Sequence, residues 1–139
     1  MAWRKIFNVA VRLKMEDGYD NEFTDLVEKE ILEKGHDALK DLIYFIRWHN
    51  PSPDSCYFAF KTLGRMEDDK THNQRRLLLE LFLCMYPKST SMMRDGAALG
   101  LASLADPASI VILKRAIKQE KVPELKEDLW AILLELQGE

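Results

Sequence analysis

The chain has 139 residues, the length of about one ordinary domain, and a formal net charge of −3. Its residues are 47% hydrophobic and 31% charged, which is the balance of a soluble globular protein with enough apolar surface for a core. The longest apolar stretch, residues 77–86, contains Glu80 and is too short to cross a bilayer, so we expect no membrane-spanning helix.

Glycine and proline are sparse, and they lie mostly between stretches in which apolar residues recur at helical spacing. These stretches predict an all-α chain of about eight helices that form one domain over residues 1–139. The first four helices are expected at residues 3–15, 22–34, 38–49 and 54–66. Val9 and Val11 blur the first apolar stripe and leave a strand open there, so residues 1–20 are interpreted as an atypical N-terminal cap.

The later helices have clearer boundaries. The fifth is expected at residues 72–86, and its predicted apolar stripe consists of Leu77, Leu78, Leu81, Phe82 and Met85. The sixth, at residues 90–104, contains Gly96 and Gly100. Because a glycine inside a helix costs roughly 1 kcal/mol against alanine, we predict that another helix approaches closely at these positions. Asp106 and Pro107 begin the seventh helix as cap and first residue, and the eighth covers residues 123–137.

The chain also shows a faint internal repeat. An offset of 70 residues, twice a unit of 35, places Pro53 on Pro123 and Leu63 on Leu133. Residues 92–107 resemble the first helix and turn of a HEAT repeat. The positions that carry the resemblance are Arg94, Ala97, Ala98, Leu101, Leu104, Asp106 and Pro107.

The resemblance to the HEAT and phycobilin-lyase-like repeat family is clearest over residues 89–137. It implies a short right-handed α-solenoid of antiparallel helix pairs. Proteins with such repeats usually bind other macromolecules along one concave row of helices, so the resemblance implies a binding role.

Charge is distributed unevenly along the chain. Residues 70–121 carry nine basic and four acidic side chains, a net of +5, whereas residues 1–69 and 122–139 each have a net charge of −4. If the helices stack in pairs, the second helices present a basic and partly aromatic row away from the core. The residues of this predicted partner-binding row are Tyr44, Arg47, Trp48, Arg75, Arg76, Leu79, Lys114, Arg115 and Lys118. A merely solvated face is the alternative interpretation of the same row.

No set of residues is typical of a catalytic, cofactor or metal site. The three histidines lack the spacing of zinc ligands, and Glu67–Asp69 lack the alternating ligands and the glycine of a calcium loop. Cys56 and Cys84 have apolar neighbours in the sequence and no basic partner close by, so we interpret both as free thiols of a cytoplasmic protein.

The sequence therefore predicts a non-catalytic protein, without cofactor or metal, that binds a protein partner with an acidic surface. Adaptors, inhibitors and immunity-type proteins work in this way, and Trp48, Tyr44 and Arg76 are the expected anchors. The negative net charge disfavours nucleic acid as the partner. Three alternatives stay open: a HEAT-like lyase or chaperone subunit for a tetrapyrrole-carrying protein, a HEAT-like nucleic-acid-binding protein, and a cap of a larger assembly or a homodimer.

Overall fold

The computed structural model describes residues 53–138 of the chain. The helices expected at residues 3–15, 22–34 and 38–49, the atypical cap at 1–20, and the predicted binding residues Tyr44, Arg47 and Trp48 lie outside the described residues.

All of the regular secondary structure in the described part is helical, and residues 53–138 contain no strand. Its five α-helices are α4 (Pro53–Arg65), α5 (His72–Glu80), α6 (Ser91–Leu104), α7 (Ile110–Gln119) and α8 (Pro123–Leu136). Two 3₁₀ turns, η1 (Asp69–Thr71) and η3 (Pro107–Ser109), precede α5 and α7, and one π-helical turn, η2 (Leu81–Met85), extends α5. The five helices expected after residue 53 are confirmed within a few residues, although the fifth changes its winding at Leu81. None of the helices within these residues combines the length and the apolar character needed to cross a bilayer.

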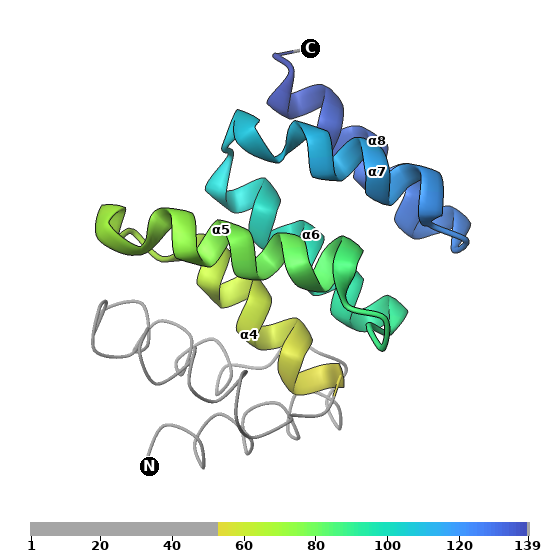
Figure 1. Ribbon diagram of the computed structural model, residues 1–139, viewed down its shortest axis with the longest axis horizontal. Coiled ribbons are helices and arrows are strands. Elements are labelled where there is room, and N and C mark those ends of the chain that lie inside the picture. Colours follow the sequence, from red (N-terminus) through yellow and green to blue (C-terminus); the bar gives the residue numbers. More distant parts are fainter. Residues whose placement is uncertain (1–52, 139) are drawn as a thin grey trace, which may run out of the picture.

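The helices form two layers (Figure 1). One layer contains α4, α6 and α8, with α6 in contact with both of the others. The second layer contains α5 with η2, and α7, which contacts η2 in its own layer and α8 in the first layer. Helices that follow one another in sequence therefore alternate between the layers.

Helices α4 and α6 approach each other at glycine residues, as the mid-helix glycines predict. A Cβ atom added at Gly96 would lie 2.7 Å from the Cα of Tyr57, and one added at Gly100 would lie 2.5 Å from the carbonyl oxygen of Phe60. No side chain larger than hydrogen fits these distances, so the glycines are required by the packing of two backbones.

The core lies between the two layers. Leu63, Leu79, Leu113 and Leu129 have no exposed surface, and they come from four different helices. The rings of Phe60 and Phe82 lie 4.7 Å apart between centroids at 31°, which joins α4 to η2. The apolar rows of α7 and α8 face the core, since Leu113, Ala116, Ile117, Leu125, Leu129, Ile132 and Leu133 are buried.

Local capping residues define the helix ends. The side chain of Thr90 accepts a hydrogen bond from Met93 N at the start of α6, and Asp106 accepts one from Ala108 N at the start of η3. Helix α6 is followed by its C-cap residue Ala105, which adopts the left-handed conformation with φ of 52°. The left-handed conformation is energetically unfavourable for alanine, because of its Cβ atom, but not for glycine.

Candidate functional site

The predicted binding residues within the described range fall into two groups. Lys114, Arg115 and Lys118 are exposed on α7, as expected of residues off the core. Arg75 and Leu79 are buried, and the prediction that they belong to an exposed face is wrong. Arg76 is intermediate in exposure: 16% of its side chain is exposed, and its guanidinium pairs with two carboxylates, those of Glu80 and Asp106.

Arg75 is buried because its guanidinium binds the end of α4. Its Nη1 donates to the carbonyl oxygens of Leu63 at 2.7 Å and Met66 at 2.6 Å, and its Nη2 donates to that of Asp68 at 2.9 Å. The last carbonyls of a helix have no partner within the helix. A buried guanidinium that reaches one of them, at Leu63, and two carbonyls of the following turn, at Met66 and Asp68, therefore holds the turn between α4 and α5 together. Arg75 therefore has a structural role.

Leu79 is buried because α5 is rotated relative to the predicted stripe. Leu79 and Leu83 point into the core, where the Leu79 side chain lies against Gly100. Leu77, Leu81 and Met85, predicted to be core residues, are exposed by 55%, 38% and 44%. The inner row of α5 and η2 is thus displaced around the helix from the one expected.

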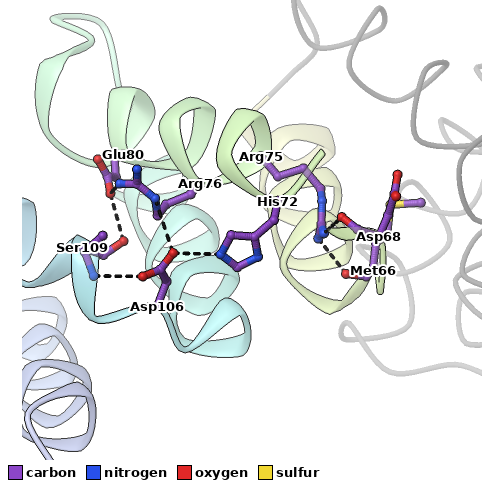
Figure 2. A network of polar contacts seen from close by, with 9 residues as sticks. Met66, Asp68, His72, Arg75, Arg76, Glu80, Asp106 and Ser109 are labelled. Carbon is purple, nitrogen blue, oxygen red and sulfur yellow. Dashed lines mark hydrogen bonds and ion pairs between the residues drawn. The ribbon is translucent and has the colours of Figure 1, made fainter. Parts of the chain in front are cut away.

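A polar network joins α5 to the start of α7, and Figure 2 shows its members converging between the two helices. His72 Nε2 donates to Asp106 Oδ2 at 2.8 Å, and Arg76 Nη1 donates to Glu80 Oε2 at 2.6 Å. The hydroxyl of Ser109, which is fully buried, donates to the same oxygen of Glu80 at 2.9 Å. These contacts hold α5 and η3 in one relative position.

Asp106 is the centre of this network. It caps η3 through Ala108 N, accepts from His72, and lies 3.6 Å from Arg76 Nε. The hydrogen bonds from Ala108 N–H and from His72 lower the pKa of Asp106, and the nearby Arg76 charge acts in the same direction. The carboxylate is therefore held ionised, in a position where one residue serves both as helix cap and as link between helices.

The outer side of α5 and η2 carries a row of exposed apolar side chains. Leu77, Leu81 and Met85 follow one another at intervals of four residues, and Val111 on α7 is exposed by 73%. Because residues four apart lie on one side of a helix, the three form a continuous apolar row. The sequence contains this spacing, but three consecutive leucines at 77–79 make several sides of the helix apolar, so the sequence does not indicate which row is exposed.

The apolar row borders the basic side of α7. The thiol of Cys84, between Leu81 and Met85 on η2, donates to Gln119 Oε1 at 3.4 Å. Arg115, one turn before Gln119, lies close enough to Cys84 for its charge to lower the pKa of the thiol against the larger raising effect of burial. We call the surface formed by Leu77, Leu81, Met85, Val111, Lys114, Arg115 and Lys118 the α5–α7 face.

The cations of this face have no carboxylate partner among the described residues. Lys114, Arg115 and Lys118 form no ion pair with any residue between 53 and 138, whereas Arg76 and Arg94 of the same basic segment are paired internally. Arg94 binds Glu120 through two nitrogens at 2.8 and 3.1 Å. The α5–α7 face therefore combines apolar side chains with positive charge that no described neighbour neutralises.

Two of the hollows in the described part are candidate sites, but neither holds a catalytic set. One, of about 250 Å³, lies between η2 and α7 and is lined by Cys84, Arg94 and Glu120. Burial raises the pKa of the Cys84 thiol, and it raises that of Cys56 to about 12, so both thiols are protonated at neutral pH and are poor nucleophiles. Neither cysteine forms a disulfide bond.

The other hollow, of about 870 Å³, lies beside the acidic turn at residues 67–69. Asp68 caps η1 there, accepting from Lys70 N at 3.3 Å and from the Thr71 hydroxyl at 2.9 Å. Across residues 53–138, no three His, Cys, Asp or Glu side chains are arranged to hold a metal ion. The α5–α7 face is thus the stronger candidate for function.

Comparison with known proteins adds no identity: no family model, no curated protein and no solved structure matches the chain.

Proposed function

We propose that the chain is a non-catalytic helical-repeat protein that binds a protein partner with an acidic surface through the α5–α7 face. Adaptors, inhibitors and immunity-type proteins act in this way. The observation that carries the proposal is the exposed row Leu77, Leu81 and Met85 beside three exposed cations without carboxylate partners among the described residues.

The alternation of helices between two layers supports a solenoid of HEAT-like pairs, α4 with α5 and α6 with α7. Two positions of the HEAT resemblance also have the contacts that a repeat needs. Arg94 links the start of α6 to the residue after α7 through Glu120, and Asp106 caps the second helix of its pair. The α5–α7 face would then be the row of second helices, on the concave side along which repeat proteins bind their partners.

The chemistry of the face indicates the kind of partner. Exposed apolar rows of this kind mark protein contact sites, because burying them removes apolar surface from water. The cations at the edge favour a partner with carboxylates and speed its approach, although they contribute less to affinity than the apolar contacts. Arg76 is not an anchor in this scheme, since it is held by Glu80 and Asp106.

The test compares charge reversal on and off the face in the full chain. Proteins from the native host are captured on wild-type chain, on Lys114→Glu/Lys118→Glu, on Leu77→Ser/Met85→Ser, and on the control Lys70→Glu/Lys126→Glu. All of the substituted residues are exposed, and the two charge variants change the net charge equally. The partner is then purified, and its affinity for each variant is measured by calorimetry.

We expect the control to retain the partner and both face variants to lose it by tenfold or more. If a captured partner binds both face variants as tightly as wild type, the assignment of the face is wrong. Duplex DNA retained at physiological salt, and lost on reversal of Lys114 and Lys118, would instead establish nucleic-acid binding, because phosphate contacts weaken steeply with salt.

A further inference from the structure

Helix α8 carries a second exposed apolar surface, away from the core. Its inner residues Leu129 and Leu133 are buried, but Trp130 and Leu134 are exposed by 49% and 41%. They lie four residues apart and therefore on one side of the helix. A half-exposed tryptophan beside a leucine is the type of pair that dominates binding energy at protein interfaces.

The charge around this pair is predominantly negative, although one cation, Lys126, is exposed four residues before Trp130. Glu124 and Glu127 are exposed, and the spacing 124, 127, 131 and 134 places them along the same side of α8 as Leu134. Asp128 is also exposed, and its charge raises the pKa of Asp95 on α6, after the larger effect of burial. We call the surface formed by Glu124, Glu127, Trp130 and Leu134 the α8 face.

The α8 face and the α5–α7 face are complementary in chemistry. Each consists of exposed apolar side chains with charges along one edge, and the charges have opposite sign: Glu124 and Glu127 on one, Lys114, Arg115 and Lys118 on the other. We propose that a second copy of this chain docks its α8 face on the α5–α7 face. The inference rests on the proposed function, because it uses the same binding face and names a partner for it.

The contact has to be made between molecules. The inner side of α8 packs against α6 and α7, and α5 lies with α7 in the other layer (Figure 1), so a chain cannot fold its own α8 onto its own α5–α7 face. Two different surfaces meet in such a contact, which leaves one free copy of each surface at the ends of a dimer. Association is therefore head to tail, and it continues into longer chains as concentration rises.

The size of the two faces makes the association weak. The interface would consist of two anchors on α8 and four apolar residues on the α5–α7 face. Interfaces of this small size, below about 1,200 Å² in total, form transiently. Self-association then occupies the partner-binding face when the chain is concentrated and leaves it free when the chain is dilute. A foreign acidic partner competes with the second copy for the same residues.

The experiment uses the full chain and two variants, each with one face altered. Trp130→Ser/Leu134→Ser removes the apolar pair of the α8 face, and Lys114→Glu/Lys118→Glu reverses the charge of the α5–α7 face. Sedimentation velocity is measured for each protein at ten to several hundred micromolar and at low and high salt. All of the substituted residues are exposed, and circular dichroism melts establish that both variants are folded.

We expect wild-type chain to form dimers and longer species that decrease as salt is raised, and each variant alone to be monomeric. An equimolar mixture of the two variants is expected to form a one-to-one dimer and nothing larger, because the mixture contains one intact face of each kind. A symmetric dimer, in which like faces meet, cannot give this result.

Wild-type chain that stays monomeric over the whole range overturns the inference, as does a mixture of variants that stays monomeric. These outcomes are separate from failure of the proposed function. A monomeric chain whose captured partner is lost on reversing Lys114 and Lys118 keeps its function and loses only self-association.

Discussion

Replacement of Arg75 by methionine separates its observed role from the binding role expected from the sequence. Arg75 is 1% exposed and donates to three carbonyl oxygens, in the last turn of α4 and in the turn after it, at 2.6–2.9 Å. Hydrogen bonds from a charged donor contribute about 1.5–3 kcal/mol each, but methionine also removes the cost of burying a charge. We therefore expect Arg75→Met to lower the free energy of unfolding by about 3–5 kcal/mol.

The measurement is urea unfolding of the full chain, followed by circular dichroism. Total stability of a domain of this size is of the order of 5–15 kcal/mol, so Arg75→Met is expected to be folded only marginally. Arg75→Lys serves as the second variant, because an ammonium reaches one or two of the three carbonyls and retains part of the stability. Arg115→Met, an exposed arginine on α7, is the matched control and is expected to change stability by less than about 0.5 kcal/mol.

An unfolding free energy of Arg75→Met within about 1 kcal/mol of wild type would refute the reasoning, since three buried carbonyl oxygens cannot lose a charged partner so cheaply. A variant that keeps its stability but loses a partner would restore the role in binding that the sequence predicted for Arg75.

Three further predictions concern single positions in the described part. Gly100→Ala places a Cβ 2.5 Å from the carbonyl oxygen of Phe60, so we expect a loss of about 1–2 kcal/mol in urea unfolding even though alanine favours helix. Ala105→Gly relieves the left-handed conformation at φ of 52° and should raise stability by up to about 1 kcal/mol; a loss of stability would show that Ala105 is not strained. Because the hydrogen bonds from Ala108 N–H and His72 lower the pKa of Asp106, its contribution is complete above the ordinary carboxyl pKa near 3.8 and is lost as pH falls through the lower folded value. The slope of unfolding free energy against pH below 4 should therefore be smaller in Asp106→Asn than in wild type.

The sequence predicts helix ends well in this part of the chain because the signals at those ends are local. Pro123 begins α8, Pro107 begins η3, and Asp106 accepts the hydrogen bond that its position predicts. The close approach at Gly96 and Gly100 is also predictable, since a glycine inside a helix usually reflects a neighbouring backbone.

The orientation of α5 is not predictable from the same signals. Residues 77–83 contain six apolar side chains and Glu80. Different sides of the helix are therefore similarly apolar, and the sequence does not show which side faces the core. The choice between them depends on Arg75, whose partners Leu63 and Met66 are distant in sequence. No local sequence pattern identifies an arginine that binds the end of a preceding helix. Periodicity alone therefore predicts wrongly that Arg75 and Leu79 are exposed and that the row Leu77, Leu81 and Met85 is buried.

Polar contacts on two sides of α5 explain why the exposed apolar row stays outward. Figure 2 shows Arg75 pointing toward Met66 and Asp68, and Arg76 pointing the other way, toward Asp106. A rotation of α5 that buried Leu77 and Leu81 would withdraw Arg75 from three carbonyls and separate Glu80 from Ser109. Burying a leucine gains roughly 1.5–3 kcal/mol, but the same rotation would expose Leu79 and Leu83 and cancel that gain. The lost polar contacts then make the rotation unfavourable. The row is thus held on the outer side of α5, and a partner that bound there would lose little conformational entropy in ordering it.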